Sequence, residues 1–233
     1  MSDGGLDHGV SDQDGLPAGE AELRDARASY WDAWYAGRGA TGRKLPSQFA
    51  TFVAGELERP HRVVELGCGD GRDALFFASY GHDVVAVDAS ASAIEGCRRL
   101  ADALGERVSF IRSTIDDPDL VAKVRGDAGP RVVYARFFLH AITDREEETL
   151  LDVAAAIGDP GDLLAVEYRT TRDSSGAKVT ASHFRRFVLP ASFEARALGR
   201  GFEVVYAVEG FGFAKYRQDD AYVARTLFRR RAS

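Results

Sequence analysis

The fold is decided by the stretch Val63-Val64-Glu65-Leu66-Gly67-Cys68-Gly69-Asp70-Gly71. Its β-branched start predicts a strand, and the glycines that follow predict a tight turn. Glycine permits positive φ angles and lets a backbone approach a bound ligand closely. Because residues 73–80 then show a helical pattern, the stretch indicates a strand, a ligand-binding turn and a helix in succession.

The same alternation continues downstream of this unit. Strands are expected at 61–66, 83–87, 108–111, 131–135 and 163–167, and helices at 73–80, 92–104, 120–124, 145–157 and 191–199. This order implies a parallel, doubly wound sheet with its ligand crevice beyond the carboxyl ends of the strands. Two last strands, 202–209 and 222–230, are joined by a link too short for a crossover helix, so we expect them to pair antiparallel. The expected fold class is α/β, a doubly wound, mostly parallel seven-stranded sheet with a C-terminal antiparallel hairpin.

The chain of 233 residues suits one domain better than two. We expect a disordered tail at 1–19, because its Gly, Asp and Ser residues bury little apolar surface. Residues 20–233 are then the single domain. Within it, 168–190 interrupt the alternation with polar and basic side chains, and we interpret them as an inserted lid.

Two helices are expected ahead of the first strand, at 20–35 and at 47–57, the second capped by Ser47. Together they form an N-terminal helical cap or lid over residues 20–58. The first helix carries an aromatic cluster: Tyr30, Trp31, Trp34 and Tyr35. These rings either cover a bound cation or substrate, which aromatic faces attract, or staple the helix to the core. Tyr30 and Trp34 are the substrate-binding candidates among them.

Composition narrows the class of function. The net charge of −6 disfavours nucleic-acid binding, since neutralising phosphates takes many Lys and Arg side chains. The two cysteines, Cys68 and Cys97, indicate free thiols rather than a disulfide framework. No apolar run is long enough to span a bilayer, and the acidic, Gly-rich start is unlike a secretory signal. We expect a cytoplasmic monomer or homodimer with no membrane or nucleic-acid partner and no metal site.

A carboxylate follows the second expected strand. Asp88 closes that strand and lies 23 positions after Glu65, near the spacing of about 20 at which nucleotide-binding folds place a ribose-binding acid. A carboxylate there accepts hydrogen bonds from both ribose hydroxyls. The glycine turn and Asp88 together predict a site for a nucleoside-containing cofactor.

Both stretches resemble motifs of one enzyme family. Glu65 to Gly71 resembles the first motif of class I S-adenosylmethionine-dependent methyltransferases, and Val84 to Ser90 resembles the second. The resemblance covers residues 62–167 and extends in topology to the C-terminus. It implies a Rossmann-like fold, S-adenosyl-L-methionine as cofactor and methylation of a small-molecule acceptor.

The resemblance also implies roles for individual residues of the loop. Gly67 and Gly69, with Cys68 between them, would pass beneath the methionine part of the cofactor. Asp88 would hold the ribose. Glu65 would orient the loop or reach the amino group of the methionine part.

The adenine end departs from the family pattern. Ala89 would lie beside the adenine. After the third strand, where the family often has an acid, this chain has Thr114 and Ile115, followed by Asp116 and Asp117. Thr114 would accept from the adenine amino group through its hydroxyl and Ile115 would supply a backbone contact, but which residue contacts adenine stays open.

Two other classes of function remain. An NAD(P)-dependent oxidoreductase needs Gly-x-Gly-x-x-Gly, and Arg72 stands where the third glycine belongs. A non-catalytic S-adenosylmethionine-binding protein would carry the same motifs. The presence or absence of an acceptor pocket distinguishes that alternative from an enzyme.

Methyl transfer asks little chemistry of the protein, since a sulfonium methyl is already electrophilic and alignment of the acceptor supplies much of the rate. A base is needed only where the acceptor atom holds its proton. His140, after the fourth strand, is either that base or a packed residue that caps the next helix. Glu167, at the end of the fifth strand, is a base, an orienter of His140, or a buried, paired carboxylate that fixes the lid. O- or N-methylation is the expected reaction.

Positive charges gather in the predicted lid: Arg169, Arg172, Lys178, His183, Arg185 and Arg186. In an acidic chain, beside the expected site, they favour an acceptor that bears a phosphate or carboxylate, which Arg binds bidentately. Arg169, His183 and Arg185 are the substrate-binding candidates. Alternatively, these cations pair with acids of the core and fasten the lid. Arg136, after the fourth strand, would bind the cofactor carboxylate or the acceptor anion, or is a surface cation.

Overall fold

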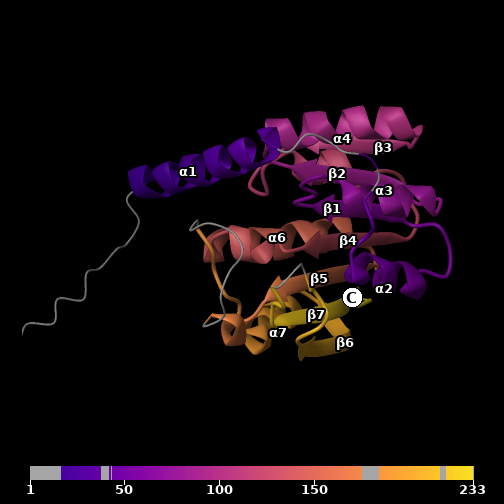
Figure 1. Ribbon diagram of the computed structural model, residues 1–233. Coiled ribbons are helices and arrows are strands. Elements are labelled where there is room, and N and C mark those ends of the chain that lie inside the picture. Colours follow the sequence, from indigo (N-terminus) through magenta and orange to yellow (C-terminus); the bar gives the residue numbers. More distant parts are fainter. Residues whose placement is uncertain (1–16, 38–41, 43, 175–183, 216–218, 233) are drawn as a thin grey trace, which may run out of the picture.

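The computed structural model describes residues 17–37, 42, 44–174, 184–215 and 219–232. In chain order its elements (Figure 1) are α1 (Pro17–Ala36), α2 (Gln48–Glu56), β1 (Arg62–Leu66), α3 (Arg72–Ser79), β2 (Asp83–Asp88), α4 (Ala91–Leu104), β3 (Val108–Arg112), α5 (Leu120–Val124), β4 (Arg131–Arg136), the 3₁₀ turn η1 (Leu139–Ala141), α6 (Asp144–Ile157), β5 (Leu163–Arg169), the 3₁₀ turn η2 (Thr171–Asp173), α7 (Pro190–Gly199), β6 (Phe202–Gly210) and β7 (Val223–Arg230). Every helix and strand expected from the sequence is present, with ends that shift by a few residues.

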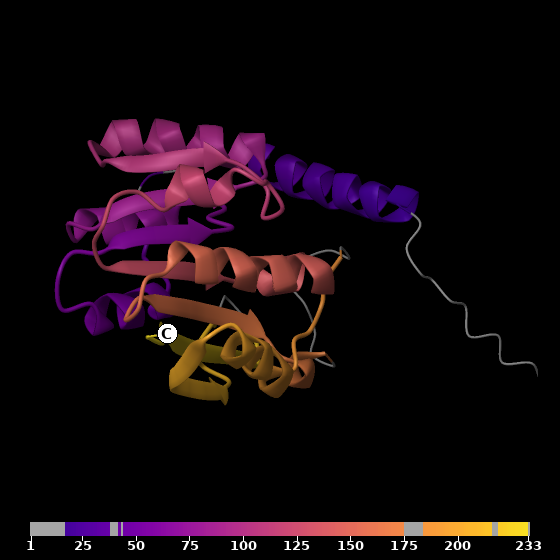
Figure 2. The same ribbon diagram turned by 180° about the vertical axis from the view of Figure 1, so that it is seen from behind.

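The strands form one sheet in the order β3-β2-β1-β4-β5-β7-β6. The first five in this order run parallel, whereas β7 pairs antiparallel with both β5 and β6. The strand order reverses between β1 and β4, and such a reversal opens a crevice at the carboxyl ends of the strands. Figures 1 and 2 show the strands stacked edge to edge with helices on both faces. The predicted seven-stranded, mostly parallel sheet with an antiparallel hairpin is confirmed.

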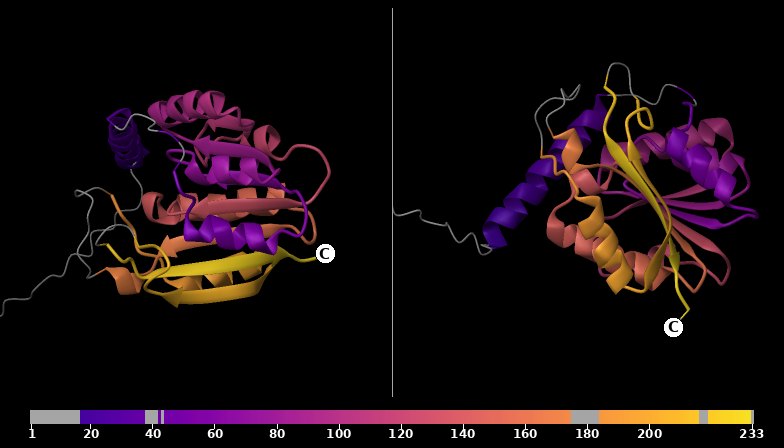
Figure 3. Two further views of the ribbon diagram at one scale, coloured as in Figure 1. Left: turned by 45° about the vertical axis from the view of Figure 1, so that its right-hand side comes forward. Right: turned by 90° about the horizontal axis from the view of Figure 1, so that it is seen from below.

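Both faces of the sheet are buried, which is why its central strands are runs of valine rather than alternating patterns. On one face Val63 and Val132 pack with the apolar sides of α2, α3 and α4. On the other face Val64 and Val133 pack with α5, α6 and α7. Figure 3 shows the sheet between these two helical layers.

Side-chain caps fix where the helices around the crevice begin. Ser47, the predicted cap of α2, accepts from the Ala50 N–H at 2.9 Å. Ser90 caps α4 in the same way, and Thr143 forms a capping box with Glu146 at the start of α6. Since α4 and α6 both begin at the carboxyl edge of the sheet, their first turns border the crevice.

Helix α1 lies outside both layers, across the carboxyl ends of the strands (Figures 1 and 3). It begins at Pro17, earlier than the predicted start at Glu20, because proline suits the first turn of a helix. The rest of the predicted tail, 1–16, lies outside the described residues. Helix α2 packs instead in the core layer beside α3, so the two helices of the predicted N-terminal cap occupy different places. No helix in the described ranges is long and apolar enough to cross a membrane.

The predicted lid is described only at its two ends, because 175–183 lie outside the described residues. At the first end β5 continues to Arg169 and the turn η2 follows. At the second end Val188 forms an isolated bridge with Thr170, and the Val188 N–H donates to the Arg169 carbonyl at 3.2 Å. Both ends of this segment are therefore anchored to the end of β5.

We predict that Ser47→Ala lowers the free energy of unfolding by about 1–2 kcal/mol, as loss of a helix cap does. Its hydroxyl also donates to the buried Asp73 carboxylate at 2.7 Å, which adds to the cost. Urea unfolding measures the change. Ser29→Ala, at an exposed position of α1, is the matched control and is expected to change stability by less than about 0.5 kcal/mol; equal values for the two variants would contradict the role of Ser47.

Candidate active site

The loop after β1 turns tightly at the carboxyl edge of the sheet. Gly67 and Gly69 have φ angles of 74° and 55°, a region that residues with a Cβ avoid. The Gly67 N–H donates to the Val87 carbonyl at 2.8 Å, which pins the loop to the end of β2. A Cβ at Gly67 would collide with the Phe138 ring, and one at Gly69 with the Tyr35 hydroxyl. Both positions therefore require glycine for conformation and for space.

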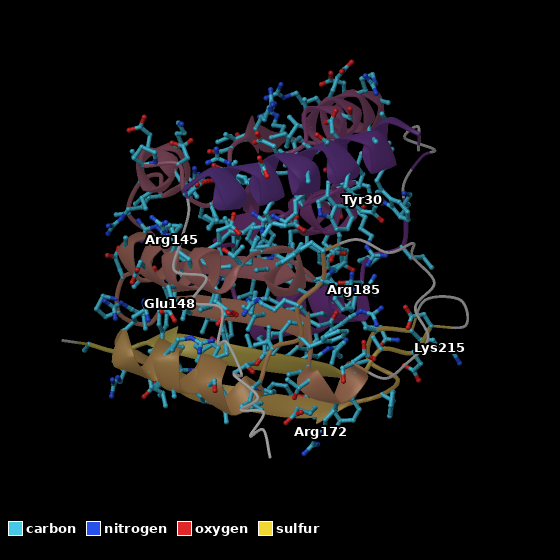
Figure 4. The ribbon with its side chains drawn as sticks, turned by 90° about the vertical axis from the view of Figure 1, so that its left-hand side faces the viewer. Tyr30, Arg145, Glu148, Arg172, Arg185 and Lys215 are labelled. Carbon is cyan, nitrogen blue, oxygen red and sulfur yellow. The ribbon has the colours of Figure 1, made fainter. Side chains whose placement is uncertain are left out.

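A cavity of about 150 Å³ lies between this loop, the end of β2 and helix α1. Its walls come from five segments of the chain: Leu66 and Gly67; Val87, Asp88, Ala89 and Ser90; Ser113, Thr114, Ile115 and Leu120; Phe137, Phe138, Ala141, Ile142 and Glu146; and Arg24, Arg27, Ala28, Trp31 and Tyr35. Figure 4, which looks onto this edge, shows α1 crossing in front of the sheet with the labelled Tyr30 above Arg185. The sheet and α1 thus enclose the crevice between them.

Asp88 stands where β2 meets the cavity. One carboxylate oxygen accepts from the Gly69 N–H and the other from the Ser90 N–H, each at 2.9 Å. Burial raises the pKa of Asp88, and these hydrogen bonds oppose the rise. Each carboxylate oxygen has lone pairs left for a hydroxyl donor. The position suits the predicted ribose contact, which stays a prediction.

The wall of the cavity is mostly apolar. Ala89, Thr114 and Ile115 line it, as the sequence suggests for an adenine site. Asp117 has other partners, because the Lys123 ammonium donates to it at 2.6 Å and the Ser113 hydroxyl also donates; these contacts lower its pKa to about 2. Of the candidates for the adenine contact, Thr114 and Ile115 are the two in the cavity wall.

Glu65 lies outside the cavity wall and is only 4% exposed. Burial raises its pKa well above the usual value, and the nearby Asp73 adds to the rise. Within the described part of the chain, its Oε2 has no hydrogen-bond partner. An uncompensated buried carboxyl group is costly, so a cationic group beside Glu65 would stabilise the ionised form.

Cys68 belongs to the loop but not to the cavity wall. It is buried, and a hydrogen bond with Cys97 together with burial raises the pKa of its thiol. Cys97 in turn donates to the Gly69 carbonyl at 3.3 Å. Both cysteines are free, buried thiols, as predicted. The contact of Cys68 with the cofactor stays a prediction.

Three charged side chains on neighbouring strands form a buried cluster at the carboxyl edge. In the sheet register, Glu167 of β5 is paired with Arg136 of β4 on one side and with Arg225 of β7 on the other. The two Glu167 oxygens lie 2.7 Å from the Arg136 Nε and 2.6 Å from the Arg225 Nε, and Glu167 is fully buried. Although burial lowers the pKa of Arg136, the charge of Glu167 raises it above its usual value. Two guanidinium groups share this one carboxylate, and the charge of the nearby Asp73 also acts on Arg136.

Phe137 joins this cluster to the cavity. It follows Arg136 directly, lines the cavity, and has a φ of 52°, unusual for a residue with a side chain. The Arg136 guanidinium lies 4.4 Å from the centre of its ring. His140 is buried in η1 with its ring edge-on to Phe137 at 5.6 Å, beside the cavity rather than in its wall. Glu167 forms its ion pairs with Arg136 and Arg225.

Two arginines near the predicted lid are matched by acids of this chain. Arg169 contacts Asp173 and Asp219, each at 2.6 Å. Arg186 donates to the buried Glu147 on α6. Such ion pairs agree with the alternative that these arginines fasten the segment rather than bind an acceptor.

The remaining cations of that segment differ in exposure. Arg172 is exposed and donates to the Tyr222 hydroxyl at 2.8 Å. Arg185 is half-buried, and burial together with the charge of Arg169 lowers its pKa. His183 and Lys178 lie outside the described residues.

Helix α1 turns one stripe toward the cavity: Arg24, Arg27, Ala28, Trp31 and Tyr35. This spacing of three and four residues marks a single helical face. The candidates Tyr30 and Trp34 are not in the cavity wall; their rings stack on each other at 6.3 Å. Both aromatic pairs, Tyr30 with Trp34 and Trp31 with Tyr35, are spaced by four residues, and the structure turns the second pair toward the cavity. Burial, together with Asp88, raises the pKa of Tyr35 well above its usual value, so its hydroxyl stays protonated.

The glycine loop and Asp88 fall within a stretch that matches a known protein family. Residues 63–161, which include the glycine loop and Asp88, match the family model described as a methyltransferase domain. Residues 63–161 are therefore a methyltransferase domain of this family. No curated protein sequence matches the chain.

Solved structures share the fold of this methyltransferase. An S-adenosylmethionine-dependent methyltransferase from Anabaena variabilis has a TM-score of 0.68 at 18% identity, over 89% of this chain and 94% of that one. Magnesium protoporphyrin IX methyltransferase from Synechocystis with bound S-adenosylmethionine has a TM-score of 0.55 at 14% identity, over 99% and 87%. The cyclase SpnF has a TM-score of 0.61 at 16% identity, over 90% and 94%.

The cofactor of this family is S-adenosylmethionine, which supplies an electrophilic methyl group when bound. The residues present fit it. Asp88 offers acceptors for hydroxyl groups, Ala89 and Ile115 offer apolar walls for a purine, and the uncompensated Glu65 suits an ammonium group. Gly67, which lines the cavity, offers backbone without a side chain to the part of the cofactor that connects these groups.

We predict that Asp88→Ala lowers the affinity for S-adenosylhomocysteine by roughly tenfold or more, the usual cost of losing hydrogen bonds to a charged group. Isothermal calorimetry measures it. Asp83→Ala, at the exposed start of the same strand, is the matched control. Unchanged affinity in a folded Asp88 variant would remove Asp88 from the cofactor site.

Glu65→Gln tests the buried carboxyl group. Its folded pKa lies above the usual 4.5, so its contribution to stability is complete below that pH and is lost as pH rises toward the raised value. Above neutral pH we therefore predict that the variant, without cofactor, melts a few degrees higher than wild type, while its affinity for S-adenosylhomocysteine falls roughly tenfold. Melting curves across pH and calorimetry check this. A variant that melts lower than wild type at high pH would contradict the prediction.

Proposed function

We propose that this methyltransferase methylates an oxygen or nitrogen atom of a small acceptor that bears a carboxylate or phosphate. The observation that carries the proposal is the cluster of Arg136, Glu167 and Arg225, in which two guanidinium groups share one buried carboxylate. A buried positive charge is costly unless an anion pairs with it. An acceptor anion at the carboxyl edge of the sheet would supply that partner.

Within the cluster, Arg136 is the member that reaches outward. Its side chain is 16% exposed, against 7% for Arg225 and none for Glu167. Arg225 is held in place because it donates to the Phe213 carbonyl at 2.8 Å and lies over the Phe213 ring. Arg136 rests on Phe137, which lines the cavity. Arg136 is therefore our choice for the acceptor anion, with Arg225 and Glu167 orienting it.

The other substrate-binding candidates have different roles in this proposal. Arg169 already has two carboxylate partners, which supports a fastening role for it. Arg185 is half-buried and close enough to Tyr30 for the two to interact electrostatically. We assign Arg185 and Tyr30 to the outer edge of the acceptor site, and Trp34 to support of Tyr30 through their stacked rings.

Proton removal falls to His140 where the acceptor atom still holds a proton. Imidazole titrates near neutral pH, and His140 lies against Phe137 at the edge of the cavity. Glu167 is unsuited to this task, because both of its oxygens are engaged by the guanidinium groups of Arg136 and Arg225. Its role in the proposal is to orient Arg136.

We predict that Arg136→Met raises the KM for a carboxylate-bearing acceptor roughly tenfold or more and leaves the KM for the matching amide unchanged. Transfer of a labelled methyl group to paired carboxylates and amides measures both. Arg99→Met, at an exposed position of α4, is the control. Calorimetry on the same variant should give wild-type affinity for S-adenosylhomocysteine.

Two outcomes would overturn the proposal. If Arg136→Met weakens S-adenosylhomocysteine as much as the acceptor, the guanidinium serves the cofactor carboxylate instead. If the protein binds S-adenosylhomocysteine but transfers no methyl group to any member of a broad panel, the non-catalytic alternative gains support. The cyclase with the same fold shows why transfer itself must be measured.

A further inference from the structure

Helix α1 is the outer wall of the cofactor cavity, yet it takes no part in the two large cores of the domain. Five of its side chains line the cavity, and none of its described residues belongs to the apolar clusters on either face of the sheet. Polar contacts join the helix to the domain on both sides of the cavity. Such an element moves at a lower cost than one that is part of the core.

The first contact joins α1 to the start of α6. The two Arg27 Nη atoms each lie 2.6 Å from an oxygen of Glu146, and Nη1 also donates to the Ala141 carbonyl at 3.1 Å. Arg27 is 10% exposed and Glu146 is 17% exposed. Glu146 also accepts from the Thr143 N–H at 2.7 Å as part of the α6 capping box. A bidentate, largely buried pair of this kind is among the stronger side-chain contacts.

The second contact joins α1 to the start of α4. The Asp32 Oδ1 accepts from the Ser90 hydroxyl at 2.8 Å and from the Ser92 N–H at 2.9 Å. These donors, the Ser92 N–H first, lower the pKa of Asp32, so it is ionised at neutral pH. A carboxylate is also favoured at a helix N-terminus by the helix dipole. The Ser90 N–H meanwhile donates to Asp88, so this contact reaches the cavity wall itself.

We propose that Arg27 and Asp32 are positioning residues for the cofactor. They anchor α1 to α6 and α4, on opposite sides of the cavity, and so hold Trp31 and Tyr35 over the glycine loop. The cofactor is released when these two contacts open and α1 moves away from the edge of the sheet. Because the cores on both faces of the sheet are complete without α1, this opening does not require the domain to unfold.

The experiment uses a reporter that the chain already contains. Its two tryptophans, Trp31 and Trp34, both lie on α1, so tryptophan fluorescence, excited at a wavelength that tyrosine does not absorb, follows this helix. In stopped-flow displacement of S-adenosylhomocysteine, we expect Arg27→Ala and Asp32→Asn to raise the dissociation rate roughly tenfold or more. Arg27→Lys keeps the charge but loses the bidentate geometry, so an intermediate rate is expected. Melting temperatures without cofactor should stay near the wild-type value.

Asp25→Asn is the matched control, because it removes a carboxylate from the same helix at a side chain that is 79% exposed. It should leave the dissociation rate unchanged. Glu146→Gln combined with Arg27→Ala should be hardly faster than either single variant, since both break the same contact. The inference fails if Arg27→Ala and Asp32→Asn release S-adenosylhomocysteine at the wild-type rate, or if Asp25→Asn accelerates release equally. Neither result depends on which acceptor the enzyme methylates.

Discussion

The carboxylate of Asp88 holds together the two segments that make the cofactor site. It accepts one backbone N–H from the glycine loop after β1 and another from the start of α4. The loop has left-handed glycines and therefore little conformational preference of its own. The Asp88 carboxylate and the Val87 carbonyl at the end of β2 fix the path of the loop. The reversal of strand order beside β1 opens the crevice above it.

The order of strands and helices was predictable because local chemistry and global fold agree in this part of the chain. A strand such as Arg62–Leu66 is rich in β-branched residues and flanked by breakers, and the sheet buries it on both faces. Ser47 acts as a helix cap wherever the helix lies in the fold. The glycine turn and Asp88 could likewise be recognised from short stretches of sequence.

The partners of charged residues were not predictable in the same way. Glu167 meets Arg225, which is 58 positions further along the chain, and Arg169 meets Asp219, which is 50 positions further. Such pairs depend on which strand lies beside β5, and composition does not encode that. The basic segment after β5 therefore looked like a binding surface, although several of its arginines have carboxylate partners in the chain. The position of the aromatic residues around α1 was not predictable either, because the sequence alone does not say which face of the helix turns toward the cavity.

The strained backbone of Phe137 fixes the directions of the neighbouring side chains and lowers the stability of the fold. A non-glycine residue at a φ of 52° costs the folded state on the order of 1–3 kcal/mol, a sizeable share of the 5–15 kcal/mol that holds an ordinary domain together. Glycine at this position would relax the backbone, but it would also free the direction in which Arg136 and Phe138 leave β4. Selection for heat resistance alone would therefore be expected to replace Phe137 with glycine. The side chains of Arg136 and Phe138 would then no longer be held in fixed directions.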